Sequence, residues 1–249
     1  ARARTNRHPM IKAIVFDWGQ TMVDSAQGFR KAEKQAQKSI FADLAISDQD
    51  AFMQHYRRIR RECHEKSRLS RVMIWRELYW YYCREADQEK LQAWEQDYWH
   101  TVERYTQVFP EALRVLQALA RQYRLALITN TQGQTDQQAH RLRAYPELTA
   151  CFEVVVVAGE NDVPPKPDAQ AFERCLDKLQ LPPSEAAYVG DDWRNDVLGA
   201  RDVGMHPVWL KHHSVKRNYP DVSCSVPVIT SLDELPTLLA SDVFASQAE

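Results

Sequence analysis

The sequence predicts an α/β protein built on a doubly wound, Rossmann-like parallel sheet, with a helical segment inserted after the first strand. Short apolar runs rich in β-branched residues recur along the chain, and each run ends in a turn. Such runs, apolar throughout instead of alternating, are typical of parallel strands that are buried on both faces. These runs are Ile11–Phe16, Leu125–Thr129, Glu153–Val157, Ala187–Val189, Pro207–Leu210 and Val226–Ile229.

Helical patterns occupy the intervals between these runs and are the second observation behind the prediction. In Glu111–Gln122 leucines recur at the spacing of one helix face, and Ala169–Leu179 shows a similar apolar pattern. Shorter helical patterns cover Asp196–Val203 and Leu232–Leu239. Because alternating strands and helices form a parallel sheet covered by helices on both faces, the order of elements predicts the doubly wound class.

The alternation stops between Asp24 and Tyr105. This stretch has one glycine, no proline and almost no strand pattern, and it is dense in long polar and aromatic residues. It therefore predicts several helices placed in the first crossover of the sheet. We expect a core formed by residues 10–24 and 108–249 and a helical insert at residues 25–107.

The composition excludes several classes of protein. The 32 Lys and Arg residues nearly balance the 34 Asp and Glu residues, for a formal net charge of −2. This balance argues against a dedicated nucleic-acid binder. An apolar content of 44% is enough for a packed core. No apolar run approaches the roughly 18–20 residues that cross a bilayer, so we expect no membrane partner.

The five cysteines are widely scattered and include no CxxC pair, so the sequence indicates neither a zinc site nor a disulfide framework. Unpaired cysteines favour a reducing compartment, for which we predict the cytoplasm, with an organelle matrix left open. Residues 1–9 carry three arginines and no acidic residue. We set them apart as an N-terminal extension whose origin the sequence leaves open.

The residues that could bind a ligand or take part in catalysis follow the predicted strands. Ligands of a doubly wound sheet bind beyond the carboxyl ends of its strands, so these positions are the site candidates. They are Asp17 and Gly19 after the first strand, Thr129 and Asn130 after the second, Lys166 after the third, and Asp191 and Asp196 after the fourth. Crowded carboxylates repel one another unless a cation lies among them, and oxygen ligands suit Mg²⁺. A lysine beside them would balance charge and bind a phosphoryl oxygen.

Four motifs in this order, FDWGQT, LITNT, KPD and GDDWRND, resemble those of the haloacid dehalogenase superfamily of hydrolases. The resemblance extends from Ile11 to about Leu239. It implies a Mg²⁺-dependent phosphohydrolase that acts on a small phosphorylated or anionic metabolite. Asp17 would be the nucleophile that forms an aspartyl-phosphate. Thr129 would hydrogen-bond the phosphoryl group, and Lys166 would bind that group and orient Asp17.

The same resemblance implies the metal site and a role for the insert. Asp17, the carbonyl of Gly19 and Asp191 would bind Mg²⁺, with Asp196 in support. Asn130 is expected to contribute to substrate binding. Asp192 is expected to cap a helix or to support the metal site from outside the ligand set. The helical insert would be a cap that closes over the site and selects the substrate.

The sequence departs from the family's phosphatases at Gly19, where they carry an aspartate that acts as general acid and base. A glycine cannot transfer a proton, and such help is typically worth ~10²–10⁴-fold in rate. Two alternatives therefore stay open. One is a catalytically impaired binding or scaffold protein with the same fold. The other is a hydrolase resembling phosphonoacetaldehyde hydrolases or dehalogenases, which also lack this acid, although the dehalogenases have lost the acidic cluster that GDDWRND retains.

Two features of the insert have both structural and functional interpretations. The segment Arg57–Arg71 contains seven Lys or Arg and two Glu. The ordinary interpretation of such a segment is a solvent-exposed helix face. The functional alternative is a wall of the substrate site that attracts an anion. The aromatic residues among Trp75–Tyr82 are expected mainly in the core of the insert. Their alternative roles are a substrate-facing wall or a surface for an oligomer contact.

Overall fold

The computed structural model describes residues 10–131, 141–160, 162–223 and 225–241, so the predicted extension at residues 1–9 lies outside the described residues. The chain forms two compact units. The core unit takes its residues from 1–24, 108–130 and 142–249, and the helical unit from 25–107 and 131–141. Their assignment as catalytic core and cap stays a prediction.

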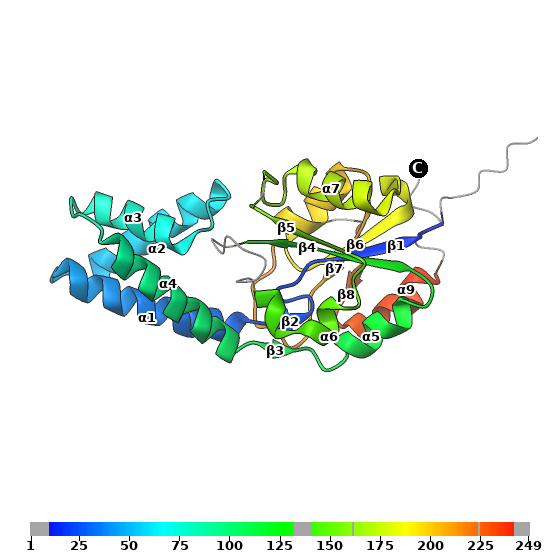
Figure 1. The fold of residues 1–249 in the computed structure, drawn as a ribbon, viewed down its shortest axis with the longest axis horizontal. Helices are drawn as coiled ribbons and strands as arrows, with labels where there is room; N and C mark the ends of the chain where they lie inside the picture. Colours follow the sequence, from blue (N-terminus) through cyan, green and yellow to red (C-terminus); the bar gives the residue numbers. More distant parts are fainter. Residues whose placement is uncertain (1–9, 132–140, 161, 224, 242–249) are drawn as a thin grey trace, which may run out of the picture. The chain divides into compact units, whose positions relative to one another are not determined.

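A sheet of six parallel strands forms the centre of the core unit, which confirms the predicted fold class (Figure 1). The strands, in spatial order, are β5 (Val154–Ala158), β4 (Arg124–Asn130), β1 (Ala13–Phe16), β6 (Ala186–Gly190), β7 (His206–Leu210) and β8 (Val228–Ile229). Each predicted apolar run overlaps one of these strands. Strand β1 lies between β4 and β6, so the residues that follow it emerge at the middle of the carboxyl edge.

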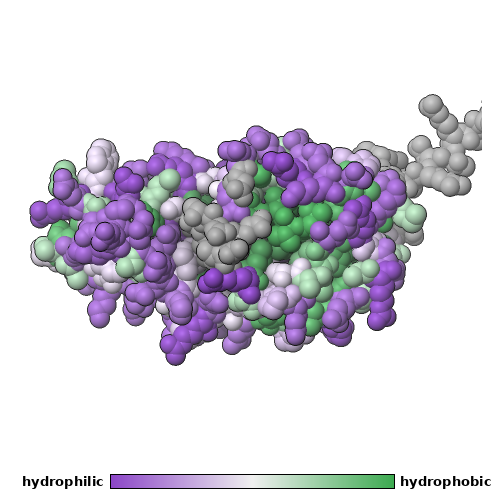
Figure 2. Space-filling model, viewed as in Figure 1, coloured by the Kyte–Doolittle hydropathy of each residue, from purple (hydrophilic) through white to green (hydrophobic). Residues whose placement is uncertain are grey.

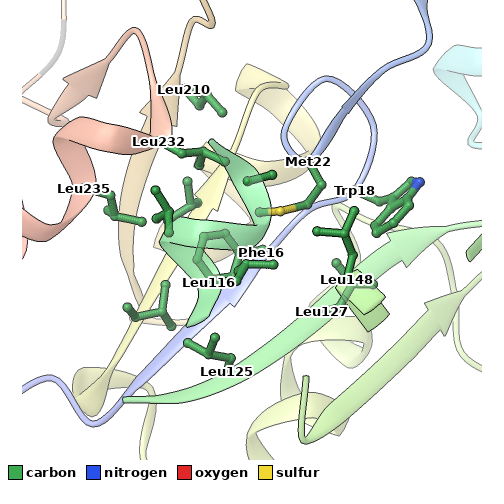
Figure 3. Packing of buried hydrophobic residues seen from close by; sticks show 14 of the residues in the cluster. Phe16, Trp18, Met22, Leu116, Leu125, Leu127, Leu148, Leu210, Leu232 and Leu235 are labelled. Carbon is green, nitrogen blue, oxygen red and sulfur yellow. The ribbon is translucent and has the colours of Figure 1, made fainter. Parts of the chain in front are cut away.

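Helices cover both faces of this sheet. The side chains of β1 point alternately to the two faces, and on each face they pack with helices in a separate apolar cluster. Ile14 and Phe16 belong to the cluster that includes residues of α5 (Ala112–Leu119), α6 (Pro146–Thr149) and α9 (Leu235–Leu239). Figure 3 shows Phe16 among Leu116, Leu232 and Leu235 of that layer. The other residues of β1 pack with α7 (Ala169–Leu179) and α8 (Gly199–Asp202) on the opposite face. Short helical turns η1 (Arg141–Ala144), η2 (Pro183–Glu185), η3 (Trp193–Leu198) and η4 (Leu232–Glu234) complete the connections.

The chain leaves the core unit after β2 (Val23–Asp24) and returns through β3 (Gln107–Val108), and these two strands pair with each other. Between them lie α1 (Ala26–Leu44), α2 (Gln49–Glu65), α3 (Arg71–Tyr81) and α4 (Gln88–Arg104). The side chains of Asp48, Ser70 and Asp87 accept hydrogen bonds from the first turns of α2, α3 and α4. Sequence-local capping thus defines where three of the four helices begin.

The helical unit has an apolar core of its own, and its aromatic run divides between that core and the surface. Trp75 and Tyr79 are buried, whereas Trp80 is 78% exposed and Tyr81 is 40% exposed. The visible surface of this unit is otherwise largely hydrophilic (Figure 2). Among the described residues, none of the helices combines the length and apolar character that a membrane crossing requires.

Candidate active site

The end of β1 holds Asp17 rigidly at the carboxyl edge of the sheet. The backbone N–H of Asp17 donates to the carbonyl of Val189 at 2.9 Å, which extends the pairing of β1 with β6 by one residue. The next side chain, Trp18, is fully buried and packs against Tyr145 with ring centroids 5.5 Å apart. In Figure 3 Trp18 lies at the edge of the apolar cluster. The burial of its neighbour therefore fixes the backbone from which the Asp17 carboxylate projects.

The ammonium group of Lys166 connects the separate parts of the site. Its Nζ lies 2.7 Å from Asp17 Oδ1, 2.7 Å from Asp196 Oδ1, 2.8 Å from the Tyr188 hydroxyl and 3.0 Å from the Ile128 carbonyl. Only 2% of the Lys166 side chain is exposed. Burial alone would lower the pKa of Lys166, but the charges of Asp17 and Asp196 raise the pKa above its ordinary value. Lys166 therefore stays protonated at physiological pH.

The backbone of Lys166 is held by the end of β4. The side-chain Oδ1 of Asn130 accepts from the Lys166 N–H at 2.8 Å, and its Nδ2 donates to the Lys166 carbonyl at 3.2 Å. Two residues further on, the Asp168 side chain accepts from Gln170 N–H at 3.0 Å and begins α7. Asn130 thus positions the backbone of Lys166. The contact of Asn130 with substrate stays a prediction. Thr129, the neighbour of Asn130 in β4, is 2% exposed.

Three carboxylates meet beside Lys166, as the strand-end argument predicts. Asp17, Asp191 and Asp196 each offer one oxygen, and these oxygens lie within 4.8 Å of one another. Asp191 follows β6 directly, and Asp196 lies in the π-helical turn η3. Asp192 caps that turn, as predicted, by accepting from the Asn195 N–H at 2.8 Å. Oxygen atoms at this spacing are suitable ligands for a small divalent cation.

Gly190 makes room for Asp196. A Cβ atom added at Gly190 would lie 2.4 Å from Cγ of Asp196, closer than non-bonded carbons approach. The last residue of β6 must therefore lack a side chain for Asp196 to reach Lys166. At Gly19, by contrast, a Cβ atom would have no neighbour within 4 Å.

Burial and mutual repulsion control the ionisation of the acidic residues. Burial raises the pKa of Asp191 well above its usual range, the charges of Asp17 and Asp196 raise it further, and Arg217 opposes the rise. Burial likewise raises the pKa of Asp196 to about 7, with Lys166 opposing. In the fully ionised state, the four aspartates of the site, counting Asp192, would exceed Lys166 and Arg217 by two formal negative charges, which is the state that the raised pKa values of Asp191 and Asp196 oppose. A divalent cation would balance this excess.

Two residues of the site were not predicted from the sequence. The hydroxyl of Tyr188 lies 3.1 Å from Asp196 Oδ1 as well as contacting Lys166, and a tyrosine inside an apolar strand was the available signal for it. Arg217 pairs with Asp191 and, at 2.8 Å, with Asp192. Arg217 lies beyond β7 in a stretch without regular structure, and no motif marks it.

The chain is similar to several known proteins. A family model described as haloacid dehalogenase-like hydrolase matches residues 11–204. A phosphoserine phosphatase of Thermus thermophilus is 39% identical over 103 residues, which cover 41% of this chain and 40% of that protein. An N-acylneuraminate-9-phosphatase of Rattus norvegicus is 26% identical over 93% of this chain and 94% of that protein. A solved structure of a 2-haloacid dehalogenase from Pseudomonas syringae pv. Tomato DC3000 is 25% identical, with a TM-score of 0.64 over 93% of this chain and 99% of that chain.

Replacing Gly190 by alanine should destabilise the core unit by about 1–3 kcal/mol, the usual cost of overpacking a rigid interior. The added methyl group must either distort β6 or displace Asp196 from Lys166. Urea unfolding of Gly190→Ala measures the change, and Gly19→Ala is the matched control because its methyl group enters open space. Equal unfolding midpoints for the two variants would contradict the close approach of Asp196 to β6.

Proposed function

Because the chain belongs to the haloacid dehalogenase-like hydrolases, we propose that it is a Mg²⁺-dependent phosphohydrolase that acts on a small phosphorylated metabolite through an aspartyl-phosphate. The main support is the hydrogen bond of 2.7 Å between Lys166 and Asp17, next to two further carboxylates. Two relatives, one matching part of the chain and one matching most of it, are named as a phosphoserine phosphatase and an N-acylneuraminate-9-phosphatase. Both names support a phosphate-ester substrate.

In this proposal the chain's own residues carry out two displacement steps. A carboxylate oxygen of Asp17 attacks phosphorus, and the bond from phosphorus to the leaving oxygen breaks with its electron pair on that oxygen. Lys166 orients Asp17 through their hydrogen bond and brings positive charge to the phosphoryl oxygens. Thr129 would donate its hydroxyl proton to one of those oxygens. Water then attacks the phosphorus of the aspartyl-phosphate, which releases phosphate and restores the Asp17 carboxylate.

The donor set fits Mg²⁺, which would be held by Asp17, Asp191 and the Gly19 carbonyl, with Asp196 in support. When bound, the ion would neutralise the developing charge of the phosphoryl group. A divalent ion would balance the two formal negative charges by which the four aspartates, when all are ionised, exceed Lys166 and Arg217. Asp196 is engaged by Lys166, Tyr188 and the Asp192 N–H, so it suits a supporting role better than direct ligation.

Gly19 favours a second candidate function, a catalytically impaired binding protein, because no side chain at this position protonates the leaving group. The intact pairing of Asp17 with Lys166 favours the hydrolase. A dehalogenase-like reaction has less support, although one structural relative is named as a dehalogenase. The cluster of Asp17, Asp191 and Asp196 fits a metal-dependent reaction better, because the dehalogenases have lost the acidic cluster that this chain retains. The cytoplasmic location and the oligomer contact through the aromatic run remain predictions.

The phosphohydrolase proposal predicts Mg²⁺-dependent hydrolysis of aryl phosphates that disappears in Asp17→Asn. The asparagine keeps the shape of the side chain but removes the anionic nucleophile. A screen of phosphate esters with and without Mg²⁺ measures this. Calorimetry of Asp191→Ala should in parallel show the loss of Mg²⁺ binding. Hydrolysis by Asp17→Asn at the wild-type rate would exclude the aspartyl-phosphate route, and unchanged calorimetry would exclude the metal site.

Arg217 should weaken Mg²⁺ binding, because its guanidinium occupies Asp191 and repels an arriving cation. We expect Arg217→Gln to bind Mg²⁺ about tenfold more tightly, equivalent to ~1.4 kcal/mol of relieved repulsion. Calorimetry at fixed salt measures the dissociation constant. Lys211→Gln is the matched control, since it removes a charge that lies over the Trp209 ring instead of the carboxylates. Weaker Mg²⁺ binding by Arg217→Gln than by Lys211→Gln would mean that Arg217 supports Mg²⁺ binding instead of opposing it.

Gly19 should make the enzyme selective for good leaving groups. An aryl oxide leaves without a proton, whereas an alkoxide needs one. Installing Gly19→Asp should raise the turnover of alkyl phosphates, up to the ~10²–10⁴-fold range of general acid–base catalysis. The first atom of the new side chain meets no obstruction, since a Cβ atom at this position would have no neighbour within 4 Å.

Gly19→Asn is the matched control for this change, because it has the same shape but no titratable proton. The measurement is the ratio of kcat/KM for an alkyl phosphate to that for p-nitrophenyl phosphate in all three proteins. Fast alkyl-phosphate hydrolysis by the wild type, with no gain in Gly19→Asp, would mean that another residue supplies the proton. Absence of turnover on every ester, with Mg²⁺ bound, would favour the binding protein.

A further inference from the structure

The helical unit contains a cavity of about 1030 Å³, at the upper end of the range for small-molecule sites. Its walls come mainly from α1 and α2, with single residues of α3 and α4. Part of the wall is apolar, formed by Phe29, Phe41, Phe52 and Met53. The charged part is strongly unbalanced, with one acidic residue, Glu33, against six basic residues, which are Arg30, Lys34, Lys38, Arg57, Arg60 and Arg71.

The Arg71 guanidinium is buried in the wall of this cavity, with 4% of its side chain exposed. It lies over the Tyr98 ring at 4.9 Å and donates to the Leu69 carbonyl at 2.9 Å. Glu33 forms an ion pair with it, at 4.0 Å from Arg71 Nε. A buried charge is costly unless an opposite charge balances it. The balance at Arg71 therefore depends on how many other cations share the Glu33 carboxylate.

Glu33 also serves other partners. Its Oε1 lies 3.1 Å from Arg60 Nη1, and its Oε2 accepts from the Tyr98 hydroxyl at 3.0 Å. Burial would raise the pKa of Glu33, but Arg71 and Arg60 lower it, so the residue is ionised. The Glu33 carboxylate thus faces two guanidinium groups, and the lining of the cavity has an excess of positive charge.

His64 adds a polar atom to the same wall. Burial and the charges of Arg71 and Arg60 lower the pKa of His64 to about 4, so the ring is neutral at physiological pH. Its Nε2 is buried and has no hydrogen-bond partner among the described residues. Buried polar atoms normally have partners, so His64 adds an unsatisfied polar atom to a wall that already carries an excess of positive charge.

We propose that this cavity binds an organic anion, with its oxyanion group paired to Arg60 and Arg71 near His64 and its apolar body against Phe41, Phe52 and Met53. Guanidinium groups bind carboxylate and phosphate oxygens in forked pairs, which suits such a group. This assignment gives the basic segment Arg57–Arg71 a specific role, because three of its arginines, Arg57, Arg60 and Arg71, line the cavity together with His64. Arg58 and Arg68 instead form exposed ion pairs with Glu62 and Glu77.

The anion has two sources, the distal group of the hydrolysed substrate or a separate effector. The first source rests on the proposed phosphohydrolase function, and the second does not. Binding is therefore tested without catalysis, and the source is tested afterwards.

The binding test is calorimetry of the full chain with 2-naphthoate and with its neutral counterpart 2-naphthylmethanol. We expect saturable binding of one naphthoate, weakened by salt, and at least tenfold weaker binding of the alcohol. Arg60→Gln should weaken naphthoate binding about tenfold. Arg61→Gln is the matched control, because Arg61 is exposed and does not line the cavity. Arg71→Lys, which keeps the charge but not the fork, should also weaken binding, and thermal unfolding verifies that each variant is folded.

Three results would overturn the proposal: no saturable naphthoate binding at millimolar concentration, equal binding of acid and alcohol, or equal binding by Arg60→Gln and Arg61→Gln. The source follows from aryl-phosphate hydrolysis in the presence of naphthoate. Competitive inhibition that Arg60→Gln relieves assigns the site to the substrate, and non-competitive modulation assigns it to an effector. If no ester is hydrolysed, the proposed function fails while calorimetry still decides whether the cavity binds an anion.

Discussion

The buried ammonium group of Lys166 holds the core unit's site together. It is the meeting point of four chain segments, since its partners are the Asp17 carboxylate after β1, the Ile128 carbonyl of β4, the Tyr188 hydroxyl of β6 and the Asp196 carboxylate of η3. Removing one member of a buried charged set leaves the others uncompensated, at a cost of several kcal/mol. The same contacts that stabilise the carboxyl edge of the sheet therefore also hold the Asp17 carboxylate in place.

The second constraint on this site is the close approach of the Asp196 side chain to the backbone of β6, which explains why the residue at position 190 is a glycine. The carboxylate of Asp196 occupies the space that a side chain at Gly190 would fill. Gly19 is different, because space is available there and its conformation does not need a glycine. The absence of an acid at Gly19 is thus a chemical property of this chain and not a steric requirement of the fold, which is why it bears on the choice between hydrolase and binding protein.

The two units carry charge of opposite sign at their polar centres. In the core unit, aspartates outnumber the cations that contact them, and the set favours a bound cation. In the helical unit, the basic residues around Glu33 outnumber it, and the cavity favours a bound anion. Charge excess of this kind is unfavourable for folding unless a ligand provides the counter-charge. In the core unit the missing positive charge would come from Mg²⁺. In the helical unit the missing negative charge would come from an organic anion.

Local patterns in the chain were enough to predict the succession of strands, the helical nature of the insert and the aspartates and lysine of the site, because apolar runs and strand-end motifs are contiguous in sequence. They also predicted that Asp17, Lys166, Asp191 and Asp196 converge, since parallel strands end at one edge. Three contacts became visible only in the folded chain: Asn130 holds the Lys166 backbone, Arg217 pairs with Asp191, and Arg71 is buried beside Glu33. These partners are far apart in sequence or lie outside any motif, so their contacts arise from packing and not from local pattern.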